Sequence, residues 1–169
     1  MTIRFELLDH QHDRRSFQSG ALQLDDWFKT RASQDQRRRI AQVYVALDEH
    51  GIVGFYSLSM FTISLDSLPA SLARKLPRYS AIPAASIGRL ARAERTQGTG
   101  IGGVLLNHAF RAILAAAESI AAYAILVDAK DEKAVRFYQA RGFVALAAQP
   151  NRLFILAETV VSALAASSK

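Results

Sequence analysis

The sequence predicts a single α/β domain in which a mixed central sheet is flanked by helices, and three observations lead to this prediction. The chain has 169 residues, of which 50% are hydrophobic, so it can bury one sizeable core. A strand, a glycine-rich loop, a long amphipathic helix and a second strand follow one another from residue 85 to residue 127, as in a right-handed crossover unit. A β-hairpin comes before this unit.

The N-terminal part is expected to hold a helix and this hairpin. Apolar residues recur at roughly helical spacing over residues 21–35, which predicts an amphipathic helix with Trp27 in the core. Residues 42–47 and 52–60 are typical of strands. They flank a short polar turn that ends at Gly51, a residue that can take a positive φ, so we expect the two strands to pair.

The rest of the chain completes the sheet. We expect a loop with one short helix over 67–83, strands over 85–92, 123–127, 143–147 and 152–157, and helices over about 105–117 and 132–141. Asp131 can cap the last helix and Gly142 can end it at the C′ position. Pro150-Asn151 is expected to form the final turn, and an Ala/Ser-rich tail from Ser162 is expected to fray.

The run from Arg95 to Gly103 is the most informative stretch of the chain. Its glycines let the backbone approach a ligand closely, and the helix that follows offers unpaired N–H groups and the positive end of its dipole. Such a loop suits a pyrophosphate. The alternative is a helix start that binds nothing, although glycines there weaken the helix without a ligand.

The spacing of the glycines limits which nucleotide the loop can hold. Gly98, Gly100 and Gly103 satisfy G-x-G-x-x-G, but a dinucleotide-binding motif directly follows its strand and usually opens its domain, whereas about ninety residues precede this one. No Gly-Lys-Ser/Thr closes the loop, so it is not a Walker A motif. The remaining pattern, Arg95-x-x-Gly98-x-Gly100, resembles the pyrophosphate loop of the GNAT family of N-acetyltransferases.

Further motifs make this resemblance more specific. The chain is similar to the GNAT toxins of bacterial type II toxin-antitoxin systems in these motifs: Phe17-x-Ser19-Gly20, Leu24-x-x-Trp27-Phe28, Gly54-Phe55-Tyr56-Ser57-Leu58, Ile87-Gly88-Arg89-Leu90-Ala91, Arg136-Phe137-Tyr138 and Gly142-Phe143. The resemblance implies the GNAT fold, acetyl-CoA as co-substrate, and acetylation of the α-amino group of aminoacyl-tRNA, which blocks translation. It also implies neutralisation by a ribbon-helix-helix antitoxin, contact with operator DNA only through that antitoxin, and a homodimer as in many similar toxins.

The resemblance also assigns roles to individual residues. The cofactor-binding set is Leu90, Ala91, Arg92, Arg95, Gln97, Gly98, Thr99, Gly100, Ile101, Gly102, Gly103 and Asp131. A backbone N–H of the splayed strand around residues 90–92 would polarise the thioester carbonyl, and the hydroxyl of Tyr138 would protonate the departing thiolate as general acid. A core aromatic role for Tyr138 is the alternative, since Ala134 and Val135 share its side of the helix.

Two residues depart from the family pattern. Ser19 stands where many relatives have cysteine, and Arg92 follows Leu90-Ala91 where a small apolar residue is usual. The change at Arg92 could alter contacts to the substrate. Hydrogen bonding by the backbone does not depend on the side chain, so it would survive this change.

The charge balance points to a polyanionic partner. Lys and Arg outnumber Asp and Glu by 21 to 15, and the pI is close to 10.0. We expect the acceptor-stem phosphates to be bound by Arg37, Arg38, Arg39, Arg74, Lys75, Arg78 and Arg89; a solvated face is the alternative. The pKa of the acceptor amine also favours an α-amine over a lysine side chain. An α-amine has a pKa of about 7.7 to 8.0 and so has an appreciable neutral fraction near pH 7 without a general base, whereas a lysine side chain has a pKa of about 10.4.

Composition limits the classes of protein to which the chain can belong. The chain has no cysteine, no signal-peptide core and no apolar run of the ~18 residues that a spanning helix needs. Its four histidines are not all spaced as a metal cluster; His10 and His12 could share a metal, but a polar N-terminal turn is the favoured interpretation. A cytoplasmic protein without metal or membrane contact is therefore expected. Two alternatives to the toxin stay open. One is a GNAT enzyme acting on a small amine or a protein N-terminus, and the other is a non-catalytic regulator that binds acetyl-CoA or, with its antitoxin, operator DNA.

Overall fold

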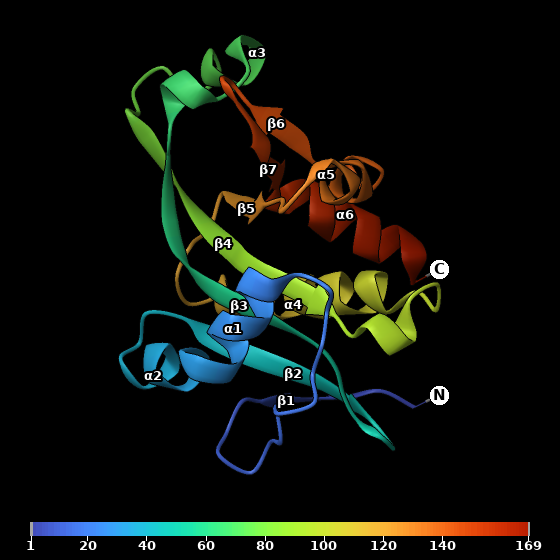
Figure 1. Ribbon diagram of the computed structural model, residues 1–169. Coiled ribbons are helices and arrows are strands. Elements are labelled where there is room, and N and C mark those ends of the chain that lie inside the picture. Colours follow the sequence, from blue (N-terminus) through green and yellow to red (C-terminus); the bar gives the residue numbers. More distant parts are fainter. Residues whose placement is uncertain (1, 169) are drawn as a thin grey trace. The chain divides into compact units, whose positions relative to one another are not determined.

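The computed structural model describes residues 2–168 of the chain, and Figure 1 colours them from the N-terminus to the C-terminus. The strands form one seven-stranded mixed sheet, which confirms the predicted fold class. Their order is β1 (Arg4–Leu7), β2 (Gln42–Asp48), β3 (Gly51–Ser64), β4 (Ala81–Arg92), β5 (Ala124–Asp128), β7 (Gln149–Leu156) and β6 (Val144–Leu146). The chain divides into two compact units, residues 1–59 with 88–111 and residues 60–87 with 112–169. We call them unit 1 and unit 2.

Unit 1 holds the predicted hairpin and the glycine-rich loop. Its elements are β1 (Arg4–Leu7), α1 (Leu22–Thr30), α2 (Ala32–Arg37), β2 (Gln42–Asp48), the first part of β3 (Gly51–Ser64), the end of β4 (Ala81–Arg92), the 3₁₀ turn η2 (Glu94–Thr96) and the start of α4 (Ile101–Ala116). β2 and β3 pair antiparallel down to Asp48 opposite Gly51, whose φ of 123° confirms the expected turn. β1, too short and polar to be predicted, pairs antiparallel with β2.

The helix predicted over 21–35 is two helices, so that prediction is corrected. Arg31 separates α1 from α2 and leaves the helical region, with φ −127° and ψ −19°. The Phe28 carbonyl, which a continuous helix would bond to the amide of Ala32, instead accepts a hydrogen bond from Nη1 of Arg14 at 2.6 Å. A side chain far away in the sequence thus ends α1, and helical periodicity could not reveal it.

Aromatic residues build the core of unit 1. The ring of Phe28 stacks on Phe55 with centroids 4.0 Å apart, and Phe17 meets both rings edge-on. Trp27 is 2% exposed, which confirms its predicted place in the core. Its indole N–H donates to Asp35 at 2.9 Å, so the one polar atom of the buried ring is satisfied.

Unit 2 contains the C-terminal strands and helices. Its elements are the end of β3, the 3₁₀ turn η1 (Leu65–Ser67), α3 (Ala70–Ala73), the start of β4, the end of α4, β5 (Ala124–Asp128), α5 (Glu132–Gln139), β6 (Val144–Leu146), β7 (Gln149–Leu156) and α6 (Ala157–Ser167). β4 pairs in parallel with β5 over Ala84–Ile87, which confirms the parallel pairing expected of the crossover unit. α6 continues to Ser167, through the residues expected as a frayed tail.

The ends of α5 follow the sequence signals, whereas the last turn does not. Oδ1 of Asp131 accepts from the Ala134 amide at 2.8 Å, and Gly142 has a φ of 96°, so both predicted capping roles are confirmed. The predicted Pro150-Asn151 turn is wrong, because Pro150 lies inside β7 and the chain turns at Ala148, whose φ is 60°. Pro150 precedes Arg152, the first β7 residue paired with β5, and its missing N–H is therefore tolerated there.

Candidate active site and phosphate-binding loop

The glycine-rich loop of unit 1 has the backbone geometry of an anion cradle. Gly98 and Gly100 have φ values of 81° and 84°, a region that L side chains rarely adopt. A Cβ atom built on either residue would meet no atom within 4 Å, so the space in front of the loop is open. The amide of Val104 donates to the Gly100 carbonyl, which places Gly100 at the start of the 16-residue helix α4. The residues present therefore fit a pyrophosphate.

Threonine side chains fix the path into this loop. Oγ1 of Thr96 donates to the Ala93 carbonyl at 2.7 Å, and Oγ1 of Thr99 donates to the Thr96 carbonyl at 2.5 Å. Thr96 is buried, whereas Gln97 and Thr99 are exposed beside the two glycines. These bonds hold the loop in shape without using the amides of the glycines.

Arg95, expected among the cofactor-binding residues, is anchored to the β2–β3 hairpin. Its guanidinium donates two hydrogen bonds of 2.9 Å to the carboxylate of Asp48. The Asp48 side chain is 2% exposed and that of Arg95 is 43% exposed. This ion pair holds the pKa of Asp48 well below its usual range against the effect of burial. The pair ties the start of the loop to the adjacent hairpin.

The end of β4 holds the residues expected to polarise the thioester. Ala91 is buried, and Leu90 and Arg92 are partly exposed. A Cβ atom on Gly54 would lie 2.9 Å from the Ala91 carbonyl oxygen and 2.7 Å from Cδ1 of Leu105, so only glycine fits between β4 and α4 here. Close packing against β4 and α4 therefore explains why a glycine begins the Gly54-Phe55-Tyr56-Ser57-Leu58 motif.

Tyr138, the expected general acid, lies on α5 in unit 2 and is buried. Its ring meets Phe137 and Phe143 edge-on, with centroids 5.2 and 5.3 Å away. Among residues 2–168 no hydrogen bond joins its hydroxyl to another group. Burial raises the pKa of Tyr138, and the carboxylate of Asp128 raises it further. The hydroxyl thus stays protonated and able to donate at neutral pH.

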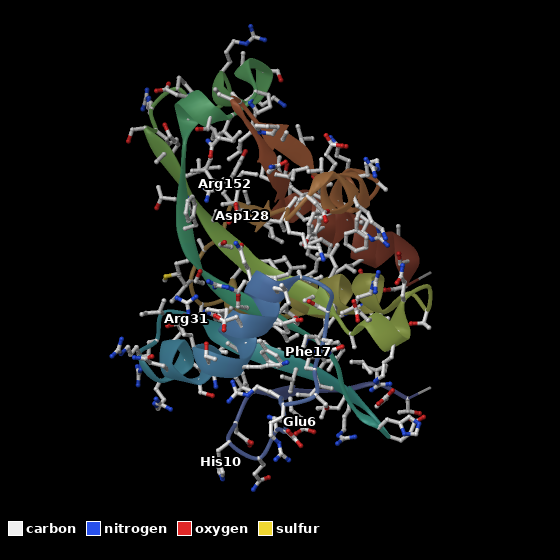
Figure 2. All side chains as sticks on the ribbon, in the orientation of Figure 1. Glu6, His10, Phe17, Arg31, Asp128 and Arg152 are labelled. Carbon is white, nitrogen blue, oxygen red and sulfur yellow. The ribbon has the colours of Figure 1, made fainter. Side chains whose placement is uncertain are left out.

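A charged group that sequence reasoning missed stands near Tyr138. Asp128, at the end of β5, lies opposite Arg152 of β7 and accepts a hydrogen bond of 2.8 Å from its Nε atom. The Arg152 guanidinium also lies over the Phe61 ring at 5.0 Å. Figure 2 shows Arg152 and Asp128 next to each other. The pairing of β5 with β7 brings them together, so no local sequence signal could have found them.

The cations expected to bind RNA fall into three groups. Arg37, Arg38 and Arg39 are exposed at the end of α2, in unit 1, and Arg74, Lys75 and Arg78 are exposed around the end of α3, in unit 2. Arg89 is partly exposed, and its guanidinium lies 4.0 Å from the centroid of the Trp27 ring. The first six are thus accessible to a ligand, while Arg89 also packs on the core of unit 1.

The part of the chain that the structure describes holds no group of three or more His, Asp or Glu side chains that could bind a metal ion. His12 bonds to Glu6 and Asp9 and belongs to a polar turn. Over the same residues, no helix is both long and apolar enough to cross a membrane.

Comparison of the sequence with protein families and curated proteins gives consistent results. The acetyltransferase (GNAT) domain family matches residues 39–145. The "Probable toxin TacT" of Sinorhizobium fredii is 32% identical over 162 residues, which cover 90% of each chain. The "tRNA-acetylating toxin" of Mycobacterium tuberculosis is 32% identical over 144 residues, which cover 85% of this chain and 86% of the relative.

Solved structures with the same fold come from similar toxins. AtaT complexed with acetyl-methionyl-tRNAfMet superimposes with a TM-score of 0.88 at 26% identity, covering 96% of this chain and 99% of that one. A tyrosine-to-phenylalanine mutant of AtaT, bound to the C-terminus of the antitoxin AtaR and to acetyl-CoA, superimposes with a TM-score of 0.82 at 25% identity, covering 96% and 98%.

Proposed function

This chain belongs to the GNAT family of acetyltransferases, and on that basis we propose that it is an acetyl-CoA-dependent toxin that acetylates the α-amino group of aminoacyl-tRNA. The observation that carries the proposal is the loop of unit 1, where two left-handed glycines lead into α4 and leave an open anion cradle. The tRNA-acetylating toxin that is 32% identical over 85% of the chain supports the choice of substrate.

The residues of this chain divide the chemistry between them. The amides of Gln97 to Gly103 and the N-terminus of α4 would hold the pyrophosphate of acetyl-CoA, which supplies the acetyl thioester. Backbone N–H groups of Leu90 to Arg92 would stabilise the negative charge that develops on the carbonyl oxygen during attack by the amine. As the carbon–sulfur bond breaks, the Tyr138 hydroxyl would give its proton to the departing thiolate, and the proton that the attacking amine loses would go to solvent, since no base is assigned. Asp131 caps the helix that carries Tyr138.

The protonation states of the Tyr138 hydroxyl and of the acceptor amine fit these roles. Tyr138 needs its proton at the moment of reaction, and the raised pKa of its hydroxyl keeps that proton in place at neutral pH. The acceptor needs a neutral amine, and an α-amino group with a pKa of about 7.7 to 8.0 supplies an appreciable neutral fraction without a base. An ester next to that amine lowers its pKa further. The α-amine of aminoacyl-tRNA therefore suits a site with no assigned base.

Charge supports a polynucleotide substrate over a small amine. The net charge is +6, and six expected RNA-binding cations are exposed in two groups, Arg37 to Arg39 and Arg74, Lys75 and Arg78. Binding of tRNA through these cations would release counterions, so affinity should fall steeply with salt concentration. A small amine or a protein N-terminus would give a much weaker dependence.

The test uses purified protein, labelled acetyl-CoA and total charged tRNA, with deacylated tRNA as the matched control. We expect label in the charged pool, none in the deacylated pool, and a KM for tRNA that rises steeply with salt. Label that appears on small amines at a salt-independent rate, with charged tRNA unmodified, would refute the proposal and favour the small-amine enzyme.

Regulation follows from the same proposal. A basic toxin is a natural target for an acidic peptide, and AtaT is a structural neighbour solved with the C-terminus of its antitoxin AtaR. We expect a ribbon-helix-helix antitoxin whose C-terminal segment folds on this chain, with operator DNA contacted only through the antitoxin, and a toxin homodimer. Expression of the chain alone should arrest growth, and coexpression of the adjacent small reading frame should restore it. Normal growth at high expression without a partner would contradict the toxin assignment.

A further inference from the structure

A basic cavity of about 590 Å³ lies in unit 1, between the loop of residues 9–16 and the end of α1. Five of the side chains that line it carry basic nitrogen atoms, namely His10, His12, Arg14, Arg15 and Lys29. Among the described residues that line it, the one carboxylate is that of Asp13, which pairs with Arg15 at 2.9 Å. Arg14, Arg15 and Lys29 are cations, so three cations face one carboxylate. Sequence reasoning assigned none of these residues to the substrate.

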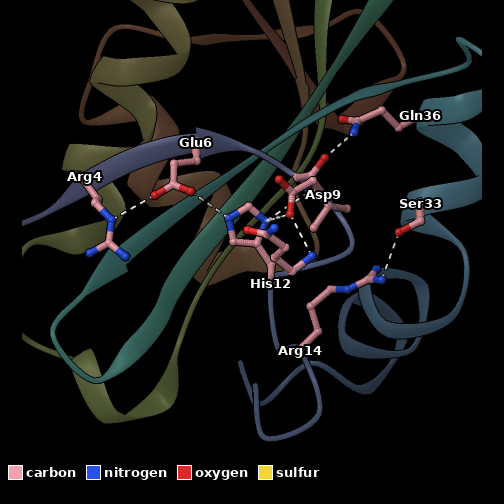
Figure 3. Close-up of polar contacts among 9 residues, drawn as sticks. Arg4, Glu6, Asp9, His12, Arg14, Ser33 and Gln36 are labelled. Atoms are coloured by element: carbon pink, nitrogen blue, oxygen red, sulfur yellow. Dashed lines mark hydrogen bonds and ion pairs between the residues drawn. The ribbon is translucent and has the colours of Figure 1, made fainter.

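The loop that forms the cavity is held in place at its start and in its middle. Gln36 donates to the Leu8 carbonyl at 2.6 Å and accepts from the Val43 amide at 2.8 Å, which fixes the start of the loop to β2. Nδ1 of His12 accepts from the Asp9 amide, so its Nε2 carries the proton and donates to Glu6 at 3.1 Å. Figure 3 shows the hydrogen bond that Gln36 donates and the contacts of His12 with Asp9 and Glu6. The cations of the loop are therefore presented by a preorganised backbone.

Arg14 carries a positive charge without an acidic partner. Nη1 donates to the Phe28 carbonyl at the C-terminal end of α1, and Nη2 donates to Oγ of Ser33 at 2.9 Å. Neither partner is charged, and within residues 2–168 no carboxylate pairs with this guanidinium. Three of its five N–H groups are left for another acceptor. A planar guanidinium with free donors and an uncompensated charge is well suited to a phosphate.

The hydrogen bond of Arg14 to Ser33 links the cavity to α2, which carries a further cation, Arg37. Ser33, the partner of Arg14, and Arg37 are four residues apart, so they lie on the same face of α2, one turn from each other. Lys29 and Arg14 thus line one cavity, and Arg37 lies one helical turn from the residue that Arg14 bonds. A line of separate cations matches the repeated phosphates of a nucleic acid backbone better than it matches one compact anion.

We propose that the cavity of Arg14, Arg15 and Lys29 binds backbone phosphates of the tRNA substrate and joins the exposed Arg37 in one phosphate track. The inference rests on the proposed function, because it takes aminoacyl-tRNA as the substrate. It adds a subsite formed by the loop of residues 9–16, which was absent from the predicted RNA-binding set. The subsite positions the RNA and takes no part in the chemical step.

The test removes single cations of the cavity. Lys29→Ala and Arg15→Ala are compared with Arg111→Ala, an exposed arginine of α4 that does not line the cavity. Binding of uncharged tRNA is measured from low to high salt, and KM is measured for tRNA and for acetyl-CoA. Arg14→Gln serves as a further variant, with its melting temperature recorded, because Arg14 also ends α1.

We expect each cavity variant to weaken tRNA binding several-fold at about 0.15 M salt and to reduce the slope of log K against log salt by roughly 0.7 to 0.9. The KM for acetyl-CoA should stay unchanged. The subsite would be overturned if the cavity variants gave the same slope of log K against log salt as Arg111→Ala. It would also be overturned if the cavity variants lost binding to an acidic peptide while their tRNA binding stayed intact. In either case the wild-type protein would still acetylate charged tRNA. A result that rules out the subsite can therefore be told apart from one that rules out the proposed function.

Discussion

Replacing Asp48 with asparagine isolates the ion pair that anchors the phosphate-binding loop. The change keeps the shape of the side chain and removes its charge, so the amide oxygen accepts one of the two 2.9 Å hydrogen bonds from Arg95 without charge assistance, and the other is lost because the amide nitrogen is a donor. Hydrogen bonds to charged groups contribute about 1.5 to 3 kcal/mol each. Because the Arg95 side chain is 43% exposed, it regains water in the variant and offsets part of the loss. We therefore expect Asp48→Asn to lower the free energy of unfolding by about 2 to 3 kcal/mol.

The pH dependence of this loss follows from the direction of the pKa shift. The pKa of Asp48 is lower in the folded protein than in the unfolded chain, so the pair stabilises the fold fully above the unfolded value of about 3.9. The stabilisation is lost as pH falls further, toward the folded pKa. Wild type and Asp48→Asn should thus differ by a constant amount from pH 8 to pH 5 and converge below about pH 4.

Urea unfolding at several pH values measures this difference, and calorimetry with acetyl-CoA measures its effect on the loop. Asp13→Asn is the matched control, because Asp13 also pairs with an arginine but both side chains are exposed. Weaker acetyl-CoA binding is expected in Asp48→Asn alone, since Arg95 begins the loop. If Asp48→Asn costs no more stability than Asp13→Asn, the anchoring role of the pair is refuted.

Three further outcomes are expected. Gly100→Asp should abolish acetyl-CoA binding in calorimetry. Gly51→Asp adds the same carboxylate at another open glycine with positive φ and should leave that binding intact. Equal loss of binding in both variants would contradict the role of the loop as a phosphate cradle. Asp131→Ala should lower stability by about 1 kcal/mol in urea unfolding through loss of the α5 cap, whereas an unchanged midpoint would show that the cap contributes nothing. Asp128→Asn should lower the pKa of Tyr138 and move the alkaline fall in turnover to lower pH; an identical pH profile would exclude that influence.

Local signals predicted much of the fold. The turn at Gly51, the cap at Asp131 and the glycine at residue 142 each depend on a single residue and its immediate neighbours, and all three are confirmed. The glycine loop and α4 were likewise predicted from a short motif and an apolar stripe. Such features are set within a few residues along the chain, where sequence patterns carry most of their information.

Features set by distant residues escaped prediction. The break between α1 and α2 depends on Arg14, fourteen residues before the carbonyl that it takes. The Asp128–Arg152 pair depends on the register of β5 with β7, and the ion pair of Arg95 depends on the hairpin that carries Asp48. In each case the physical cause is a tertiary contact. Composition identified the basic character of the protein but could not show which cations share one cavity.

The most direct test of the central claim is the single-turnover rate of acetyl transfer to charged tRNA by wild type and by Tyr138→Phe. The variant keeps the buried ring and loses only the hydroxyl, so folding and acetyl-CoA affinity should be preserved. If Tyr138 protonates the departing thiolate, transfer to the α-amino group should slow by roughly 10²- to 10⁴-fold. If the wild type transfers acetyl groups to charged tRNA and the Tyr138→Phe rate lies within a few-fold of the wild-type rate, Tyr138 is a packing residue. That result would contradict the proposed mechanism.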